Sequence, residues 1–175
     1  MSRLAPTPSD DEVDFVMSET KNKFILRFVQ PGLAGLMDGS VSTLAPIFAT
    51  AFATHNSFTT FLVGIAATVG AGISMAFSEG LSDDGTLTGR GRPFLRSIVT
   101  GGMTFLGGLG HTLPFLIPNL SLALVVAYFI VAAELILIAF IRNRYFKTPH
   151  LTSIVQVIFG GALVFITGML IGQLG

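Results

Sequence analysis

Long apolar segments alternate with short polar segments along most of the chain, and this pattern sets the expected architecture. A helix needs about 20 apolar residues to cross a bilayer. Five segments reach this length, at residues 25–53, 58–81, 96–117, 120–141 and 152–174. The pattern therefore predicts an all-α membrane protein, with a transmembrane domain of five helices over residues 25–175 and a short arm over residues 1–24.

The composition excludes a soluble protein. Apolar residues make up 51% of the 175 residues and charged residues only 11%, whereas about 25% of the residues of a soluble domain are charged. The chain has no cysteine, and therefore neither a disulfide nor a thiolate metal site. We accordingly expect a multi-pass integral membrane protein surrounded by lipid, with no enzymatic activity, no resident cofactor and no nucleic-acid partner.

The ten basic residues predict which side of the membrane each connection faces. They occur before the first apolar segment, between the second and third, and between the fourth and fifth, at Arg3, Lys21, Lys23, Arg27, Arg90, Arg92, Arg96, Arg142, Arg144 and Lys147. Because connections rich in basic residues stay in the cytosol, the N-terminus is predicted to be cytosolic and the C-terminus to face the opposite side. The arm is acidic and either gathers cations or is a solvated tail, the interpretation we favour.

An aspartate in the first apolar segment is the most informative of the polar residues. Asp38 lies eleven residues beyond Arg27, about 16 Å along a helix, which places it near the middle of a hydrocarbon core about 30 Å thick. Ser42 follows one turn later on the same face. Pro46 has no N–H for the carbonyl of Ser42, so a bent helix with a free backbone oxygen is predicted. The alternative is a buried, protonated aspartate bonded to a neighbouring hydroxyl.

Glycines predict where helices approach each other. Gly35 and Gly39 form a GxxxG pair around Asp38, and Gly168 and Gly172 form another in the last segment. Such pairs let two membrane helices come into close contact. We expect Gly39, Ser42 and Pro46 to shape and line a path beside the carboxylate.

Three further ionisable side chains lie inside the apolar segments. Met75 and Glu79 are four residues apart and share a helix face, and a thioether beside a carboxylate suits a borderline divalent ion; the alternative for Met75 is ordinary packing. Glu134 either relays protons or accepts a hydrogen bond from a neighbouring helix. His111 either carries a proton or releases a metal, or is an interfacial histidine bonded to the backbone, which we prefer. Ionisable residues within membrane helices commonly mark ion paths or buried partners.

Three motifs carry a family resemblance, MDGSVSTLAP in the first segment, GAGISMAFSE at the end of the second and LGHTLPFLIP at the end of the third. From about Gln30 onward the chain resembles the vacuolar iron transporter family, and within it most closely the membrane domain of bacterial membrane-bound ferritins. The resemblance implies a homodimer of five-helix protomers with a metal path between the two first helices. It also implies metal-binding roles for Asp38, Met75 and Glu79. A second path glutamate of plant-type members falls on Ala67 here, which reduces the number of carboxylates.

The expected function follows from the residues and the resemblance together. Two copies of Asp38 would bind a divalent cation when ionised and release it on taking up protons. The expectation is proton-coupled export of Fe(II), Mn(II) or both from the cytosol, the ion being the cargo, in a prokaryotic inner membrane. The family's cytosolic helical insert and the ferritin-like domain are not expected, and with them neither iron oxidation nor storage. The alternatives are an exporter of another small cation and a non-transporting anchor for a soluble iron protein.

Overall fold

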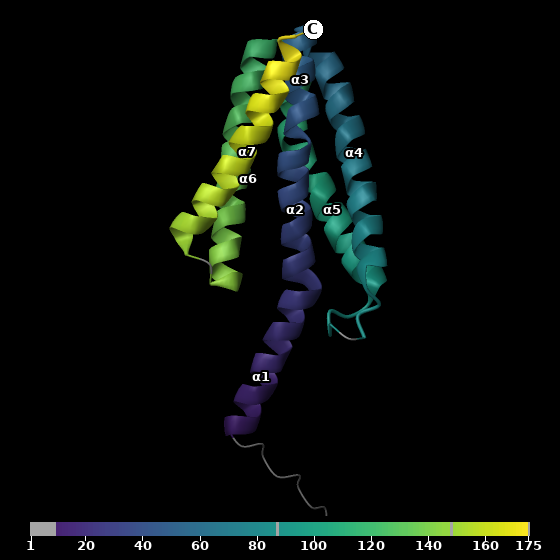
Figure 1. The fold of residues 1–175 in the computed structure, drawn as a ribbon, viewed down its shortest axis with the longest axis vertical. Helices are drawn as coiled ribbons and strands as arrows, with labels where there is room; N and C mark the ends of the chain where they lie inside the picture. The colour runs from purple at the N-terminus through teal and green to yellow at the C-terminus, as the bar shows by residue number, and fades with distance from the viewer. Residues whose placement is uncertain (1–9, 87, 148, 175) are drawn as a thin grey trace, which may run out of the picture.

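The computed structural model describes residues 10–86, 88–147 and 149–174 (Figure 1). All regular structure in these ranges is helical, which confirms the all-α prediction. The elements are α1 (Asp10–Phe24), the π-helix η1 (Ile25–Val29), α2 (Gln30–Ser42), α3 (Leu44–Thr54), α4 (Ser57–Ser82), α5 (Pro93–Thr112), the 3₁₀-helix η2 (Leu113–Leu116), α6 (Leu120–Phe146) and α7 (His150–Gly172). The last 15 residues of the predicted arm form α1, and its first nine residues lie outside the described ranges.

Three helical stretches are long and apolar enough to cross a membrane. They are Asp14–Thr54, Ser57–Ser82 and Leu120–Phe146, and Ile158–Gly172 is a shorter apolar helix. The outward surfaces of these stretches are covered by large apolar side chains such as Phe77 and Phe129, the latter 74% exposed. Exposed apolar surface on this scale marks contact with lipid or with another protein.

The first stretch is interrupted where the sequence predicts a bend. Helix α2 ends at Ser42 and α3 begins at Leu44, with Thr43 as a turn between them, because Pro46 cannot donate to the carbonyl of Ser42. A second irregularity precedes Pro31, where the N–H of Gln30 donates to the carbonyl of Ile25 in η1. This is the five-residue spacing of a π-helix.

Helix α5 packs between α2 and α4 through residues without bulky side chains. A Cβ on Gly39 would overlap the carbonyl oxygen of Thr104, and a Cβ on Gly101 would lie 2.6 Å from the carbonyl oxygen of Gly72. The second glycine pair behaves in the same way, since a Cβ on Gly168 would lie 2.7 Å from the carbonyl oxygen of Ala45 in α3. Both predicted GxxxG pairs are therefore helix contacts, here within one chain.

The apolar core lies mainly between α3, α6, η2 and α7. Phe48 is fully buried and contacts three rings, those of Phe115, Tyr128 and Phe165, at centroid distances of 6.4, 5.4 and 4.8 Å. A smaller cluster of Leu33, Leu36 and Ile138 joins α2 to α6. These contacts hold the interrupted first stretch against the rest of the bundle.

The polar connections separate by charge. The loop after α4 and the end of α6 lie at the same end of the bundle as α1, whereas the α3–α4 connection and the C-terminus lie at the other end (Figure 1). The described lysines and arginines belong to elements at the first of these ends, which we call the basic end. The separation is the one that the charge pattern predicts.

Candidate functional site

Asp38 lies on the side of α2 that faces away from α5. The next residue, Gly39, is buried against α5, whereas Ala34 and Ser42, one turn to either side of Asp38, are exposed. The Asp38 carboxylate is half-buried, and Ser42 Oγ donates to its Oδ2 over 3.5 Å. Within the described part of the chain, this long bond to its own helix is the carboxylate's one hydrogen bond, and no basic side chain pairs with it. A carboxylate flanked by small residues is open to a partner from outside the protomer.

Glu79 is occupied by two arginines at the basic end. Its Oε1 accepts hydrogen bonds from Arg90 Nη2 at 2.7 Å and from Arg96 Nε at 2.8 Å. Met75 lies one turn earlier on α4 and is half-buried. Among the described residues, no group of three or more histidine and acidic side chains is placed to hold a metal ion. The single chain thus leaves Asp38 and Glu79 in separate environments, and Glu79 is free for a cation only after its arginines move.

The sequence gives little indication of how central Arg96 is to this end of the protein. Its side chain is 0% exposed and donates to Glu79, to the backbone carbonyls of Asp83 and Gly91, and to the Asp83 carboxylate. Arg90 bridges Glu79 and Asp83 in the same way. The signal that identifies this cluster is an arginine in the first turn of an apolar helix, preceded in the sequence by the acidic residues Glu79 and Asp83.

The charges of this cluster also shift the pKa of Asp83, which lies just beyond the end of α4. Burial alone would raise the pKa of its carboxyl group. Hydrogen bonds from Thr88 and Gly85, with the guanidinium groups of Arg96 and Arg90, outweigh that effect and hold the pKa below its ordinary value. The cluster therefore favours an ionised Asp83 and anchors the loop between α4 and α5 to both helices.

The structure brings together His111 and Glu134, which the sequence singled out separately. His111 Nδ1 lies 3.0 Å from Glu134 Oε2, and His111 Nε2 lies 2.8 Å from Thr43 Oγ1. His111 is 0% exposed and the Glu134 side chain 14%. His111 therefore has two side-chain partners in place of the expected backbone partner. Glu134 is hydrogen-bonded to a side chain of a neighbouring helix, which is one of the two roles that the sequence suggests for it.

Thr43 adds a third contact that the sequence did not indicate. Its Oγ1 donates to the carbonyl of Gly39 over 2.8 Å, at the interruption between α2 and α3. One continuous set of hydrogen bonds thus runs from Glu134 on α6, through His111 on α5, to the backbone beside Asp38 on α2. All of its members except Glu134 are fully buried.

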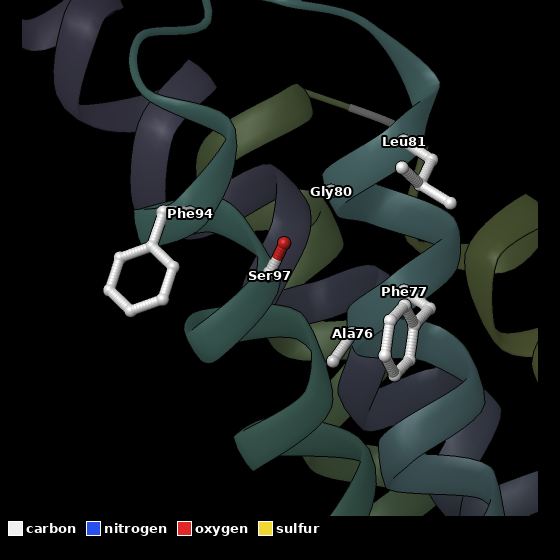
Figure 2. A pocket seen from close by; sticks show the side chains of 6 residues that line it. All are labelled: Ala76, Phe77, Gly80, Leu81, Phe94 and Ser97. Atoms are coloured by element: carbon white, nitrogen blue, oxygen red, sulfur yellow. The ribbon is translucent and has the colours of Figure 1, made fainter.

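An apolar groove lies between α4 and α5 near the basic end (Figure 2). It has a volume of about 340 Å³ and is lined by Ala76, Phe77, Gly80, Leu81, Phe94 and Ser97. The single hydroxyl group in this lining offers no set of ligands for a cation. The groove opens among exposed aromatic side chains, as a surface covered by lipid acyl chains would.

Comparison with protein-family models, with curated proteins and with solved structures finds no match to this chain. The class of the protein therefore follows from its own features: it is helical throughout its described regular structure, with three stretches able to span a membrane.

Proposed function

We propose that the chain is a five-span membrane protein that exports Fe(II), Mn(II) or both from the cytosol in exchange for protons. The observation that carries this proposal is Asp38, an ionisable side chain without a counter-charge in the described chain, on the outward face of an interrupted membrane helix. A carboxylate inside a membrane costs a few kcal/mol and is typically functional. The resemblance of MDGSVSTLAP and GAGISMAFSE to the vacuolar iron transporter family supports the same function.

The partner of Asp38 in this proposal is a second copy of the chain. A two-fold axis along the outward face of α2 would bring the two Asp38 carboxylates together, and the small residues Ala34 and Ser42 would allow the helices to approach. Two carboxylates in contact cannot both remain ionised without a cation. Binding of a divalent ion and uptake of protons are therefore mutually exclusive, which is the basis of exchange.

Met75 and Glu79 form the cytosolic entrance in this proposal. The positive charge at the basic end supports a cytosolic location for that end and the N-terminus, and the proposal takes α5 and α7 as the remaining two of five spans. Because Glu79 is bonded to Arg90 and Arg96, the entrance is closed in this arrangement of the side chains. A cation reaches Glu79 only when it displaces a guanidinium group. The membrane would be a prokaryotic inner membrane.

Transport into proteoliposomes tests the proposal. The purified protein is reconstituted with a metal-sensing dye inside the vesicles, and Mn(II) flux is measured with an imposed pH gradient. Asp38→Asn, which keeps the shape and removes the charge, should abolish the flux, whereas Asp84→Asn in the exposed loop should not. Flux through Asp38→Asn equal to that of the parent would show that the proposed site is wrong.

Cysteine cross-linking in the same vesicles tests the dimer. Because the native chain has no cysteine, each introduced cysteine is the single one in its chain. A single Ala34→Cys substitution on the outward face of α2 should give a disulfide-linked dimer on oxidation. The matched substitution Ser121→Cys, at the exposed start of α6, should not. Cross-linking of both positions alike would argue against a two-fold axis along α2.

An exporter of another small cation is the second candidate. The separation of Asp38 from Glu79 and the presence of Ala67 leave few oxygen ligands around the proposed site, which favours a less selective cation site. Competition decides between the two: Mn(II) flux should be indifferent to organic cations and should fall in Met75→Leu if the path is built for a metal.

A further inference from the structure

The hydrogen-bond set formed by Glu134, His111 and Thr43, which we call the relay, fixes how many protons its members carry. It has three contacts, each between 2.8 and 3.0 Å. Thr43 Oγ1 has one proton, and it donates that proton to the carbonyl of Gly39. Thr43 Oγ1 must then accept at its contact with His111, so His111 Nε2 carries a proton.

The third contact needs a proton of its own. With a proton on Nε2, the imidazole Nδ1 is either a bare acceptor facing a protonated Glu134, or an N–H facing an ionised Glu134. In both cases one proton lies between Nδ1 and Oε2, and the histidine–glutamate pair has no net charge. The three contacts therefore require three protons, and a neutral pair is the least costly form in a buried setting.

Removing one proton leaves a different arrangement. The pair loses one proton through Glu134, its partly exposed member, and the proton that remains lies on Nδ1, where the imidazole shares it with the ionised Glu134. The bare Nε2 then needs a donor, and the hydroxyl of Thr43 is the donor in contact with it. If Thr43 donates to Nε2, its oxygen and the carbonyl oxygen of Gly39 become two acceptors facing each other, and they must separate. The Gly39 carbonyl, one residue from Asp38, loses its side-chain donor.

We propose that Glu134, His111 and Thr43 form a proton-binding site, distinct from Asp38, whose occupancy controls the Gly39 carbonyl at the interruption between α2 and α3. This inference rests on the proposed function, since it assigns to the relay a proton that is exchanged for the cation. With the proton lost, the relay carries a negative charge and the Gly39 carbonyl has lost its side-chain donor. Both changes favour a divalent cation, and proton uptake reverses both.

The surroundings leave Glu134 as the titrating partner of His111. Helix α4 brings the hydroxyl of Thr68 near this part of α5, and its own carboxylate, Glu79, lies at the basic end. Helix α6 also carries Tyr128, whose ring stacks on Phe48. Helix α2 carries Asp38 on its outward side. None of these groups is hydrogen-bonded to His111 among the described residues.

Nitrogen-15 magnetic resonance of histidine-labelled protein in lipid tests the proposal without any transport measurement. The signal of His111 is assigned by its loss in His111→Gln, and its Nε2 is followed as the pH is raised. In the parent protein, Nε2 should lose its proton while Nδ1 keeps one. In Glu134→Gln the amide N–H donates to the bare Nδ1 of a neutral imidazole, or the amide oxygen accepts from the Nδ1–H of an imidazolium, so Nε2 should stay protonated throughout. Asp84→Asn, which removes a carboxylate in the exposed loop outside the relay, should leave the His111 transition unchanged.

Flux measurements link the relay to exchange. Glu134→Gln should bind Mn(II) with the affinity that the parent has when its relay is protonated, and its flux should respond roughly tenfold less to a pH gradient, the scale of a coupling free energy between two sites. The proposal is overturned if His111 Nε2 keeps its proton across the pH range in which the parent protein is folded and transports, or if Glu134→Gln titrates like the parent. A His111 transition without metal flux would retain the relay and reject the proposed function. Metal flux that depends on Asp38, with no change in the protonation of His111 Nε2, would retain the proposed function and reject the relay.

Discussion

Gly39 gives the sharpest test of the packing on which both proposals depend. It is buried where α2 lies against α5, and a Cβ at this position would come within 2.8 Å of the carbonyl carbon and 2.9 Å of the Cα of Thr104. These are backbone atoms, which cannot rotate away as a side chain can. Since carbon atoms pack at about 3.5–4.0 Å, the two helices must move apart by roughly 1 Å to accept alanine.

The expected cost of Gly39→Ala is about 3 kcal/mol. Inserting a methyl group into a well-packed interior costs about 1–3 kcal/mol, and the upper end applies here because backbone meets backbone. The matched control is Gly102→Ala on α5, where a Cβ would meet nothing within 4 Å. It should leave stability unchanged or raise it by up to about 1 kcal/mol, since alanine is the better helix former.

Unfolding in mixed micelles with increasing dodecyl sulfate, followed by helical circular dichroism, measures both variants. Gly39→Ala should unfold at a clearly lower fraction of dodecyl sulfate than the parent, and Gly102→Ala should not. Equal stability of the two variants would refute the close α2–α5 contact. It would then favour contacts of Gly35 and Gly39 with a second chain.

Three further predictions concern stability and can be measured in the same way. Arg96→Met leaves Glu79 and Asp83 without a buried partner and should cost about 3–5 kcal/mol, whereas Arg92→Met, at an exposed side chain just before α5, should cost little. The pKa of Asp83 is held below its ordinary value, so the charge of Asp83 stabilises the folded protein at pH values above that ordinary value. This stabilisation is lost as the pH falls through the lowered pKa. The melting temperature should therefore fall less steeply with decreasing pH in Asp83→Asn than in the parent. Phe48→Ala removes a fully buried ring from its aromatic cluster and should lower the free energy of unfolding by about 3–5 kcal/mol.

The positions of the helices could largely be predicted from the sequence, because each is fixed by local features. The predicted segment 58–81 is Ser57–Ser82 in the structure, and the interruption near Pro46 falls at Thr43. The prediction missed a change of helix type in the third segment, where α5 stops at Thr112 and a short 3₁₀-helix follows. Hydropathy does not register this change, since the residues on both sides are apolar.

The partners of the polar residues could not be predicted in the same way. The proximity of Ser42 to Asp38 follows from helical spacing within one element. The contacts of Glu79 with Arg96 and of His111 with Glu134 join different helices, and they depend on how far one helix is shifted along the other. Small residues between α2, α4 and α5 set that shift, and their effect on register is a property of the assembled bundle.

The ionisable residues inside the apolar segments differ in whether the chain itself neutralises them. Glu79 is matched by two arginines, and the carboxyl group of Glu134 is hydrogen-bonded to His111. Such internal pairing explains how these groups are tolerated in a membrane. Asp38 has only the hydroxyl of Ser42 within the described part of the chain, and a long contact to one hydroxyl does not offset the cost of an ionised carboxylate. Its compensation must come from outside the protomer, as a proton, a cation or a second copy of the chain, and exchange among these three is what a proton-coupled cation exporter requires.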